Sequence, residues 1–278
     1  GGHGKEVRTV EQVLTQYLDI CGRPSRRFYE ALAPFATSEA EQKRLEKLSG
    51  SDGAAEFKKR VEATVTFMDV LKEFSTARPT FAELCDLIPR IKARHFSIAS
   101  SQKMHPTSVH LLVVLVAWKN PDGKQRFGQC TKYLVDLKPG TPVTVDIMPS
   151  VLKLPEDPTR PIAMAGLGTG MAPFRAFIQE RAAQHAAGIK VGPMALYFGS
   201  RSQKQEYLYG EELEAYHASG LLTHLHCAFS RDQPEKIYIQ HKLQGDAKVL
   251  SDFLQQDTGS FFLCGPTWPA GDVQDAIE

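Results

Sequence analysis

A short run of glycines has the composition and spacing of a phosphate-binding turn. The sequence GLGTG at 166–170 lies between an apolar, strand-like segment and a helical pattern that opens at Pro173. Glycine lets the backbone approach a phosphate closely, and the free N–H groups at a helix start attract anions. Gly168, Thr169 and Gly170 therefore predict a nucleotide-phosphate site, although similar turns also occur without a ligand.

Basic and hydroxyl side chains follow the next two strand-like segments. Arg201 comes two residues after the segment 193–199, Ser230 ends the segment 222–230, and Arg231 follows it. Three further candidates follow shortly after these tips: Lys236, Tyr238 and Gln240. Guanidinium and hydroxyl groups suit a 2′-phosphate, whereas an NAD site favours an acidic residue at the ribose. The group predicts NADPH, although each residue alone is also compatible with an ordinary surface position.

A cysteine ends the last strand-like segment, which covers 260–265. Cys264 would lie at the same sheet edge as the glycine turn. One interpretation is a buried, inert thiol, which is common for cysteine. The functional interpretation places its sulfur beside the reacting carbon of a nicotinamide.

The elements that position these residues alternate regularly. Strand-like segments at 161–166, 193–199, 222–230 and 260–265 are separated by helical patterns that begin at Pro173 and cover 208–217 and 249–256. This alternation predicts βαβ crossovers and a parallel sheet. Ligands bind beyond the carboxyl ends of such strands, which is where the candidate residues lie.

The rest of the chain has two other textures. Residues 5–89 have helical periodicity, and a capping-box pairing recurs after Thr9, Ser38 and Thr80. Residues 94–101, 109–118 and 142–148 are β-branched and apolar, with a short helical pattern at 129–137. The first region predicts a helical packing unit, and the second predicts an incomplete barrel with one small helix.

Composition excludes several classes of protein. The chain of 278 residues has 33 basic and 32 acidic side chains, so it lacks the basic excess of a nucleic-acid-binding protein. No apolar run reaches the roughly 18 residues of a membrane span. Its 5 cysteines are scattered, which argues against disulfides and favours an intracellular setting. We interpret His224 and His226 as structural or surface histidines, and we expect no metal site.

The motifs together resemble a known family. RHFSIASS, HLLVVLV, FGQCTKYL, GLGTGMAPF, FGSRS, YLYGEEL, AFSRDQPEKIYIQ and LCGP resemble, in order, the ferredoxin–NADP reductase-like module of the diflavin reductases. That family includes NADPH–cytochrome P-450 reductase and the sulfite reductase flavoprotein, and the segment 264–269 is closer to the sulfite reductase branch. The resemblance implies a helical linking domain (1–89) inserted in an antiparallel FAD-binding barrel (90–157), followed by a parallel-sheet NADPH-binding domain (158–278).

The resemblance also implies roles in FAD binding. Arg94 matches the arginine that pairs with the FAD pyrophosphate, Phe96 replaces the tyrosine that usually stacks on the flavin, and Ser97 matches the hydroxyl beside flavin N5. Further FAD contacts are implied for His95, Leu112, Val114, Gly128, Gln129, Cys130 and Thr131. With Cys264 near the nicotinamide, Ser97 and Cys264 are the residues expected at the reacting centre.

The implied activity is hydride transfer from NADPH to FAD, followed by electron transfer to an FMN-binding flavodoxin-like domain of the same polypeptide. A haemoprotein, of cytochrome P-450 or sulfite reductase type, would be the final acceptor. Strands that precede the helical insert in the family are not found before Glu6, and the chain stops at Glu278, early in a helix. We therefore expect a C-terminally truncated piece of a longer reductase, cytoplasmic or on the cytosolic face of a membrane.

Two alternatives stay open. The first is a free-standing ferredoxin–NADP reductase, against which the long helical insert argues. The second is a non-catalytic reductase-like subunit, for which the replacement of tyrosine by Phe96 is the strongest support.

Overall fold

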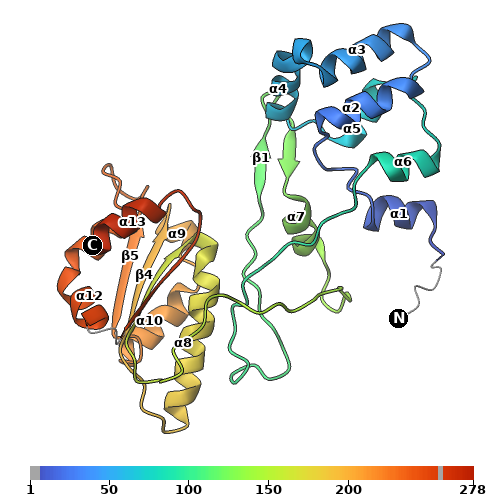
Figure 1. Cartoon of the computed structure of the whole chain (residues 1–278). Helices are drawn as coiled ribbons and strands as arrows, with labels where there is room; N and C mark the ends of the chain where they lie inside the picture. The colour runs from blue at the N-terminus through green and yellow to red at the C-terminus, as the bar shows by residue number, and fades with distance from the viewer. Residues whose placement is uncertain (1–6, 256–258) are drawn as a thin grey trace. The chain divides into compact units, whose positions relative to one another are not determined.

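A computed structural model of the chain describes residues 7–255 and 259–278. The chain forms two compact units, each of which is described by itself (Figure 1). Unit 1 comprises Gly1–Arg94 and Leu115–Lys138, and unit 2 comprises His95–Val114 and Pro139–Glu278. Residues 5 and 6 of the predicted helical region, and Gln256 at the end of the predicted helix 249–256, lie outside the described residues.

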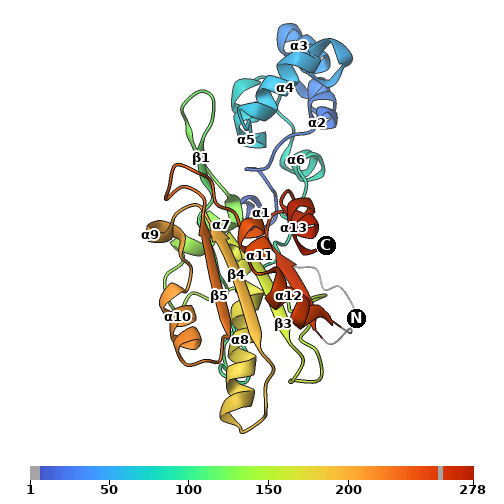
Figure 2. The ribbon, with the colours of Figure 1, turned by 90° about the vertical axis from the view of Figure 1, so that its left-hand side faces the viewer.

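Unit 2 contains the predicted parallel sheet. Its strands are β3 (Ile162–Leu167), β4 (Met194–Ser200), β5 (His224–Phe229) and β6 (Ser260–Cys264), which pair in parallel in the order β5-β4-β3-β6. Figure 2 shows β5, β4 and β3 side by side in this order. The crossovers carry η3 (Gly168–Gly170), α8 (Met171–Ala186), α9 (Gln203–Glu206), α10 (Gly210–Ala218), α11 (Ile239–Gly245) and α12 (Ala247–Leu254), and α13 (Ala270–Ile277) follows β6. The βαβ prediction is confirmed.

Both faces of this sheet are covered by helices, as Figure 1 shows with α8 on one side and α12 and α13 on the other. On one face Met164 and Leu196 pack with Phe174 of α8. On the opposite face Ala165 and Tyr197 belong to a core cluster with residues of α11, α12 and α13. Burial on both sides explains why β3 and β4 are nearly continuous apolar runs in sequence.

The strands predicted in the middle of the chain are largely absent among the described residues. Within the predicted segments 94–101 and 109–118, only β1 (Ala117–Lys119) is regular, and it pairs antiparallel with β2 (Gln125–Phe127). A single antiparallel bridge joins Ile98 and Leu111. Segment 142–148 has no strand, and its Val145 is 72% exposed. An apolar pattern makes a segment suitable for a sheet but does not supply the neighbouring strand, so the predicted barrel is not confirmed.

Unit 1 consists mainly of short helices, as its periodicity predicts. They are α1 (Val10–Gln16), α2 (Arg26–Leu32), η1 (Ala33–Phe35), α3 (Glu39–Ser49), η2 (Ser51–Gly53), α4 (Ala54–Glu62), α5 (Phe67–Glu73), α6 (Phe81–Leu87) and, after the hairpin, α7 (Gln129–Asp136). The capping boxes predicted at Thr9 and Thr80 are present, and a further box lies at Thr66. At Ser38 only half of the device forms, because the carboxylate of Glu41 accepts hydrogen bonds from Thr76 instead.

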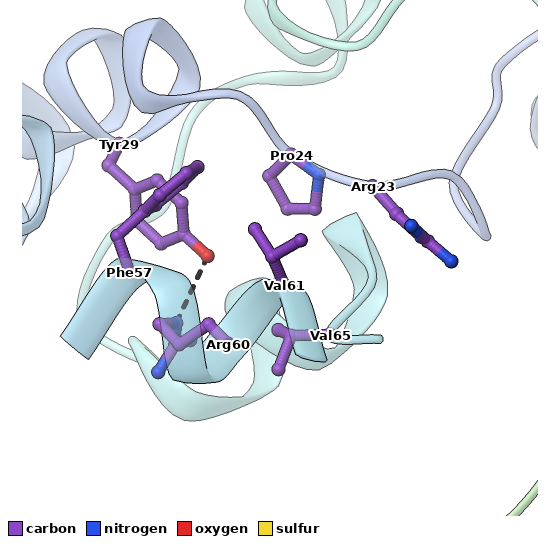
Figure 3. Close-up of a pocket in the computed structure, with 7 residues that line it drawn as sticks. All are labelled: Arg23, Pro24, Tyr29, Phe57, Arg60, Val61 and Val65. Carbon is purple, nitrogen blue, oxygen red and sulfur yellow. Dashed lines mark hydrogen bonds between the residues drawn. The ribbon is translucent and has the colours of Figure 1, made fainter. Parts of the chain in front are cut away.

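A partly buried arginine links the helices of unit 1. Arg60 of α4 donates a hydrogen bond of 3.1 Å to the Tyr29 hydroxyl and forms an ion pair of 2.6 Å with Glu73 of α5. Figure 3 shows the first of these bonds beside a small pocket that Phe57 and Val61 also line. The pocket volume is about 10 Å³, near the lower limit for one water molecule, so it cannot hold a cofactor.

Asp69 ties the hairpin to the helices. Its carboxylate accepts hydrogen bonds from the Thr66 backbone and hydroxyl and forms an ion pair of 2.7 Å with Arg126 of β2. Partial burial opposes ionisation, but the hydrogen bonds from Thr66 and the charge of Arg126 outweigh it and lower the pKa of Asp69 to about 2. One carboxylate thus caps α5 and holds β2.

We predict that Asp69→Asn lowers the free energy of unfolding of unit 1 by about 1–3 kcal/mol at pH 7, because a charged hydrogen-bond acceptor is lost. A folded-state pKa below the unfolded value stabilises the protein above the unfolded pKa, so the wild type should lose this contribution as the pH falls from about 4 to about 2. Denaturant titrations at pH 7 and at acidic pH measure both effects. Asp86→Asn, at an exposed position of α6, is the control. Equal stability of the two variants at pH 7 would contradict the assignment.

Candidate functional site

The glycine turn lies at the carboxyl end of the central strand β3. Gly168 has a φ of +54°, a left-handed conformation that other residues rarely adopt. A Cβ atom at Gly170 would lie 2.0 Å from the main-chain oxygen of Cys264, so only glycine fits there. Helix α8 begins directly afterwards at Met171 and presents its free N–H groups at this edge. The turn has the backbone form that a phosphate needs.

Cys264 ends β6 next to this turn. Its register partner in β3 is Gly166, and its side chain is half-buried. Burial raises the pKa of the Cys264 thiol, so the group is protonated at neutral pH. The structure thus brings together the glycine turn and Cys264, as their positions at strand ends predict.

The tips of β4 and β5 are joined through their backbones. The Arg231 N–H donates to the Arg201 carbonyl at 2.8 Å, and the Ser230 N–H donates to the Ser200 carbonyl at 3.0 Å. The Arg201 guanidinium is ion-paired with Glu206, its Nε lying 2.7 Å from the carboxylate, and this partner raises the pKa of Arg201. The two arginines therefore lie at adjacent strand tips. The ion pair between Arg201 and Glu206 is a contact that the sequence analysis missed.

The remaining predicted nucleotide residues lie at the start of α11. Tyr238 is the N-cap residue of this helix, and its ring lies 6.0 Å from that of His241. Gln240 donates a hydrogen bond of 3.3 Å to Asp272 of α13, and Lys236 is exposed in the preceding loop. These residues follow the carboxyl end of β5, and ligands of parallel sheets bind at the carboxyl ends of the strands.

In unit 1, Arg94 lies beside the start of α7. Its Nη2 donates a hydrogen bond of 3.2 Å to the Gln129 side chain, which in turn donates to Asp19 at 3.0 Å. Gly128 is the N-cap residue of α7, and the Thr131 hydroxyl lies 3.1 Å from its carbonyl. Two predicted FAD-pyrophosphate groups, a guanidinium and a helix start, are therefore in contact. Asp19, which holds the Gln129 side chain, has no signal in the sequence that would have indicated this role.

The other predicted FAD residues belong to unit 2, apart from Cys130, which lies half-buried in α7. His95 and Ser97 are exposed and Phe96 is half-buried, on an irregular segment that leads into the bridge at Ile98. Leu112 packs against the core of unit 2, whereas Val114 is 47% exposed. The flavin roles of these residues stay predictions.

A polar contact of α8 was missed by the sequence analysis. Arg175 donates a hydrogen bond of 2.6 Å to the Ala99 carbonyl and pairs with Glu212 of α10 at 2.7 Å. Gln179, one helical turn later, is 2% exposed and bonds to the Ser101 N–H. Two polar residues four positions apart on an otherwise apolar helix face are the signal that could have indicated this contact.

The two histidines of THLHC have protein partners. His226 lies 2.5 Å from the Asp246 carboxylate and stacks on Tyr197, and burial lowers the pKa of His226 despite that carboxylate. His224 stacks on His226 with a ring distance of 6.4 Å. Within 7–255 and 259–278, no group of three His, Cys, Asp or Glu residues is arranged to hold a metal ion.

A surface hollow lies away from the glycine turn, and a separate finding concerns membrane spans. A surface hollow of about 410 Å³, lined in part by His185, Lys190 and Thr223, lies where β4 and β5 begin, which is the opposite end of the sheet from the glycine turn. In the part of the chain that the structure describes, no helix has both the length and the apolar character of a membrane span.

Comparison with known proteins gives two family matches. The family described as "FAD binding domain" matches residues 3–133, and the family described as "Oxidoreductase NAD-binding domain" matches residues 164–274. The first match covers most of the predicted helical linking domain and part of the predicted FAD-binding barrel, and the second lies within the predicted NADPH-binding domain.

Relatives are similar over nearly the whole chain. A probable sulfite reductase [NADPH] flavoprotein component of Schizosaccharomyces pombe is 51% identical over 98% of this chain and 27% of its own length. The sulfite reductase [NADPH] flavoprotein component of Saccharomyces cerevisiae is 46% identical over 99% of this chain and 27% of its length. NADPH–cytochrome P450 reductase of Sus scrofa is 38% identical over 97% of this chain and 41% of its length. The chain spans about a quarter of the length of the first two relatives. The chain thus matches an FAD binding domain and an oxidoreductase NAD-binding domain, and over nearly its whole length it is similar to sulfite reductase flavoprotein components and NADPH–cytochrome P450 reductases.

Proposed function

We propose that this chain is the module of a reductase that receives a hydride from NADPH on FAD and passes electrons onward. The observation that carries the proposal is the carboxyl edge of the sheet in unit 2. There the turn at Gly168–Gly170, the thiol-bearing end of β6 and the two arginine-bearing strand tips follow neighbouring strands. This is a dinucleotide-binding arrangement with basic groups in place of the acidic residue typical of NAD sites.

The residues proposed for NADPH fall into three groups, according to the part of the nucleotide that each would bind. The N–H groups of the turn and of the α8 start suit the pyrophosphate. Arg201, Ser230 and Arg231 suit the 2′-phosphate, since guanidinium groups bind phosphate oxygens in pairs. Lys236, Tyr238 and Gln240 are proposed for the rest of the adenosine end.

The residues present also fit FAD. The contact between Arg94 and Gln129 at the first turn of α7 supports a pyrophosphate site, because a guanidinium and free helix N–H groups both favour an anion. FAD, when bound, supplies the hydride acceptor and can release electrons one at a time. The Phe96 ring is proposed to stack on the flavin.

Ser97 and Cys264 are proposed at the reacting centre. A serine hydroxyl can donate a hydrogen bond where negative charge develops, with little movement of its own. The Cys264 thiol is neutral, because burial raises its pKa, and so it adds no repulsion where a hydride moves. These two groups act by orientation and electrostatics, and the redox chemistry belongs to the cofactors.

Relatives guide the proposal on partners. The two sulfite reductase components are 51% and 46% identical to this chain, against 38% for the cytochrome P450 reductase, which supports a sulfite reductase type of acceptor. We propose that an FMN-binding domain of the same polypeptide receives the electrons first. We also propose that 94–101, 109–118 and 142–148, which contain no regular strand in this structure apart from the start of β1, belong to an FAD-binding barrel, within domains bounded at 89/90 and 157/158.

A flavin spectrum tests the function directly. The protein, expressed at the length its gene encodes, should purify with an oxidised flavin absorbance that NADPH bleaches under anaerobic conditions. A colourless protein that takes up no added FAD would contradict the proposal and favour a non-catalytic subunit.

Gly170→Ala tests the phosphate turn. The added methyl group would meet the Cys264 carbonyl oxygen at 2.0 Å, so the turn and β6 must separate. We expect a loss of about 1–3 kcal/mol of stability and at least a roughly tenfold weaker affinity for NADP⁺. Calorimetry and thermal melts measure these quantities. Gly245→Ala, on α11 with open space around its Cβ position, is the control and should bind NADP⁺ like the wild type.

Arg231→Ala tests the choice between nucleotides. Loss of a charged donor to the 2′-phosphate should weaken NADPH binding by about 1.5–3 kcal/mol, or roughly 10- to 100-fold, and leave NADH binding within about twofold. Steady-state kinetics with both nucleotides measure the ratio. Arg27→Ala, at an exposed position of unit 1, is the control. Equal losses for NADPH and NADH would exclude Arg231 from the phosphate site.

A further inference from the structure

A polar cluster on α8 holds the chain segment that follows Ser97. Arg175 donates to the Ala99 carbonyl at 2.6 Å, and Gln179 accepts a hydrogen bond of 3.1 Å from the Ser101 N–H. Both side chains lie on one face of α8, because they are four residues apart. Ala99 is 0% exposed and Gln179 is 2% exposed, so water competes little for these bonds.

Glu212 of α10 orients both of these side chains. One of its carboxylate oxygens accepts from Arg175 Nε at 2.7 Å, and the other accepts from Gln179 Nε2 at 3.0 Å. The Tyr209 ring lies 4.4 Å from the Arg175 guanidinium carbon. A carboxylate with two partners leaves each of them in one orientation. We call Arg175, Gln179 and Glu212 the α8 clamp.

The clamp also contacts the segment on the other side of the bridge between Ile98 and Leu111. Arg175 Nη1 lies 3.3 Å from His110 Nδ1, and the His110 carbonyl accepts from the Ala99 N–H at 2.8 Å. Burial, with the charges of His105 and Arg175, lowers the pKa of His110, so its neutral ring can accept a hydrogen bond from the Arg175 guanidinium. Arg175 therefore contacts both segments joined by this bridge, one of which begins just after Ser97.

The clamp lies between two predicted cofactor segments. Ser97 precedes Ala99 by two residues, and α8 begins directly after the turn at Gly168–Gly170. We propose that the α8 clamp is a set of positioning residues that fixes Ser97 relative to the phosphate turn and thereby sets the distance over which hydride passes from nicotinamide to flavin. This inference rests on the proposed function. It assigns a role to residues that are not themselves expected to contact either cofactor.

A double variant tests the clamp in the full-length holoenzyme. Arg175→Met with Glu212→Gln removes both charges together, so that no buried charge is left unpaired. We expect flavin reduction by NADPH, measured by stopped flow, to slow by about 10- to 100-fold, because misplacement by about 1 Å has effects of that size. FAD content and the Kd for NADP⁺ should stay within about twofold. Arg175→Lys, which keeps one charged donor, should restore part of the rate.

A second readout needs no turnover. Hydrogen exchange of the peptide 97–112 should be faster in the double variant, since its amide contacts to α8 are loosened. Glu211→Gln makes the same chemical change at the neighbouring, exposed position and should leave both rate and exchange unchanged.

The outcomes separate the two proposals. Wild-type flavin reduction and exchange in the double variant would overturn the clamp and leave the proposed function intact. A loss of NADP⁺ affinity equal to the loss of rate would make Arg175 a nucleotide-binding residue and also overturn it. A wild-type protein whose flavin NADPH does not reduce would overturn the proposed function, and the clamp with it.

Discussion

The close contact between Gly170 and the main-chain carbonyl of Cys264 is the constraint on which unit 2 depends. The ends of β3 and β6 can approach this closely because residue 170 has no side chain. Since α8 starts one residue later, the same contact fixes where that helix begins and which residues it presents to its surroundings. The positions of Arg175 and Gln179, and through them of the Ala99 segment, therefore follow from a backbone contact at the sheet edge.

Unit 1 is organised by a different principle. Its helices are short, and helices of this length are marginal in water when isolated. Side chains that bond across elements compensate: Glu41 holds Thr76, Arg60 joins Tyr29 to Glu73, and Asp69 holds Arg126. Asp69 is also part of the capping box of α5, and Tyr29 also belongs to the apolar core. Order in this unit thus comes from polar ties around a small apolar core.

Local patterns predicted those features that local chemistry decides. The helix at 129–136 and the capping boxes at Thr9 and Thr80 agree with the structure because each is encoded within a few consecutive residues. The parallel sheet agrees because the regular alternation of strands and helices itself implies parallel pairing. Among the described residues, regular strands are missing at 94–101, at 142–148 and at all of 109–118 except its last two residues, because a strand requires a partner that its own sequence does not specify. Long-range contacts such as Asp19 with Gln129 were missed for the same reason. The candidate site residues were chosen from strand ends and from family resemblance, and the geometry brings the glycine turn beside Cys264 and Arg94 beside Gln129.

On the proposed function, the ion pair between Arg201 and Glu206 gives the adenosine end of the site an internal counter-ion. Arg201 and Arg231 lie at adjacent strand tips, where two guanidinium groups without an anion would repel each other. The Glu206 carboxylate occupies the donors that a phosphate would take. On the proposed function, an arriving nucleotide exchanges one anion for another, so its affinity reflects the difference between two similar ion pairs. The same competition favours departure of the spent nucleotide, because the displaced carboxylate stays tethered within a few residues of the arginine that it can recapture.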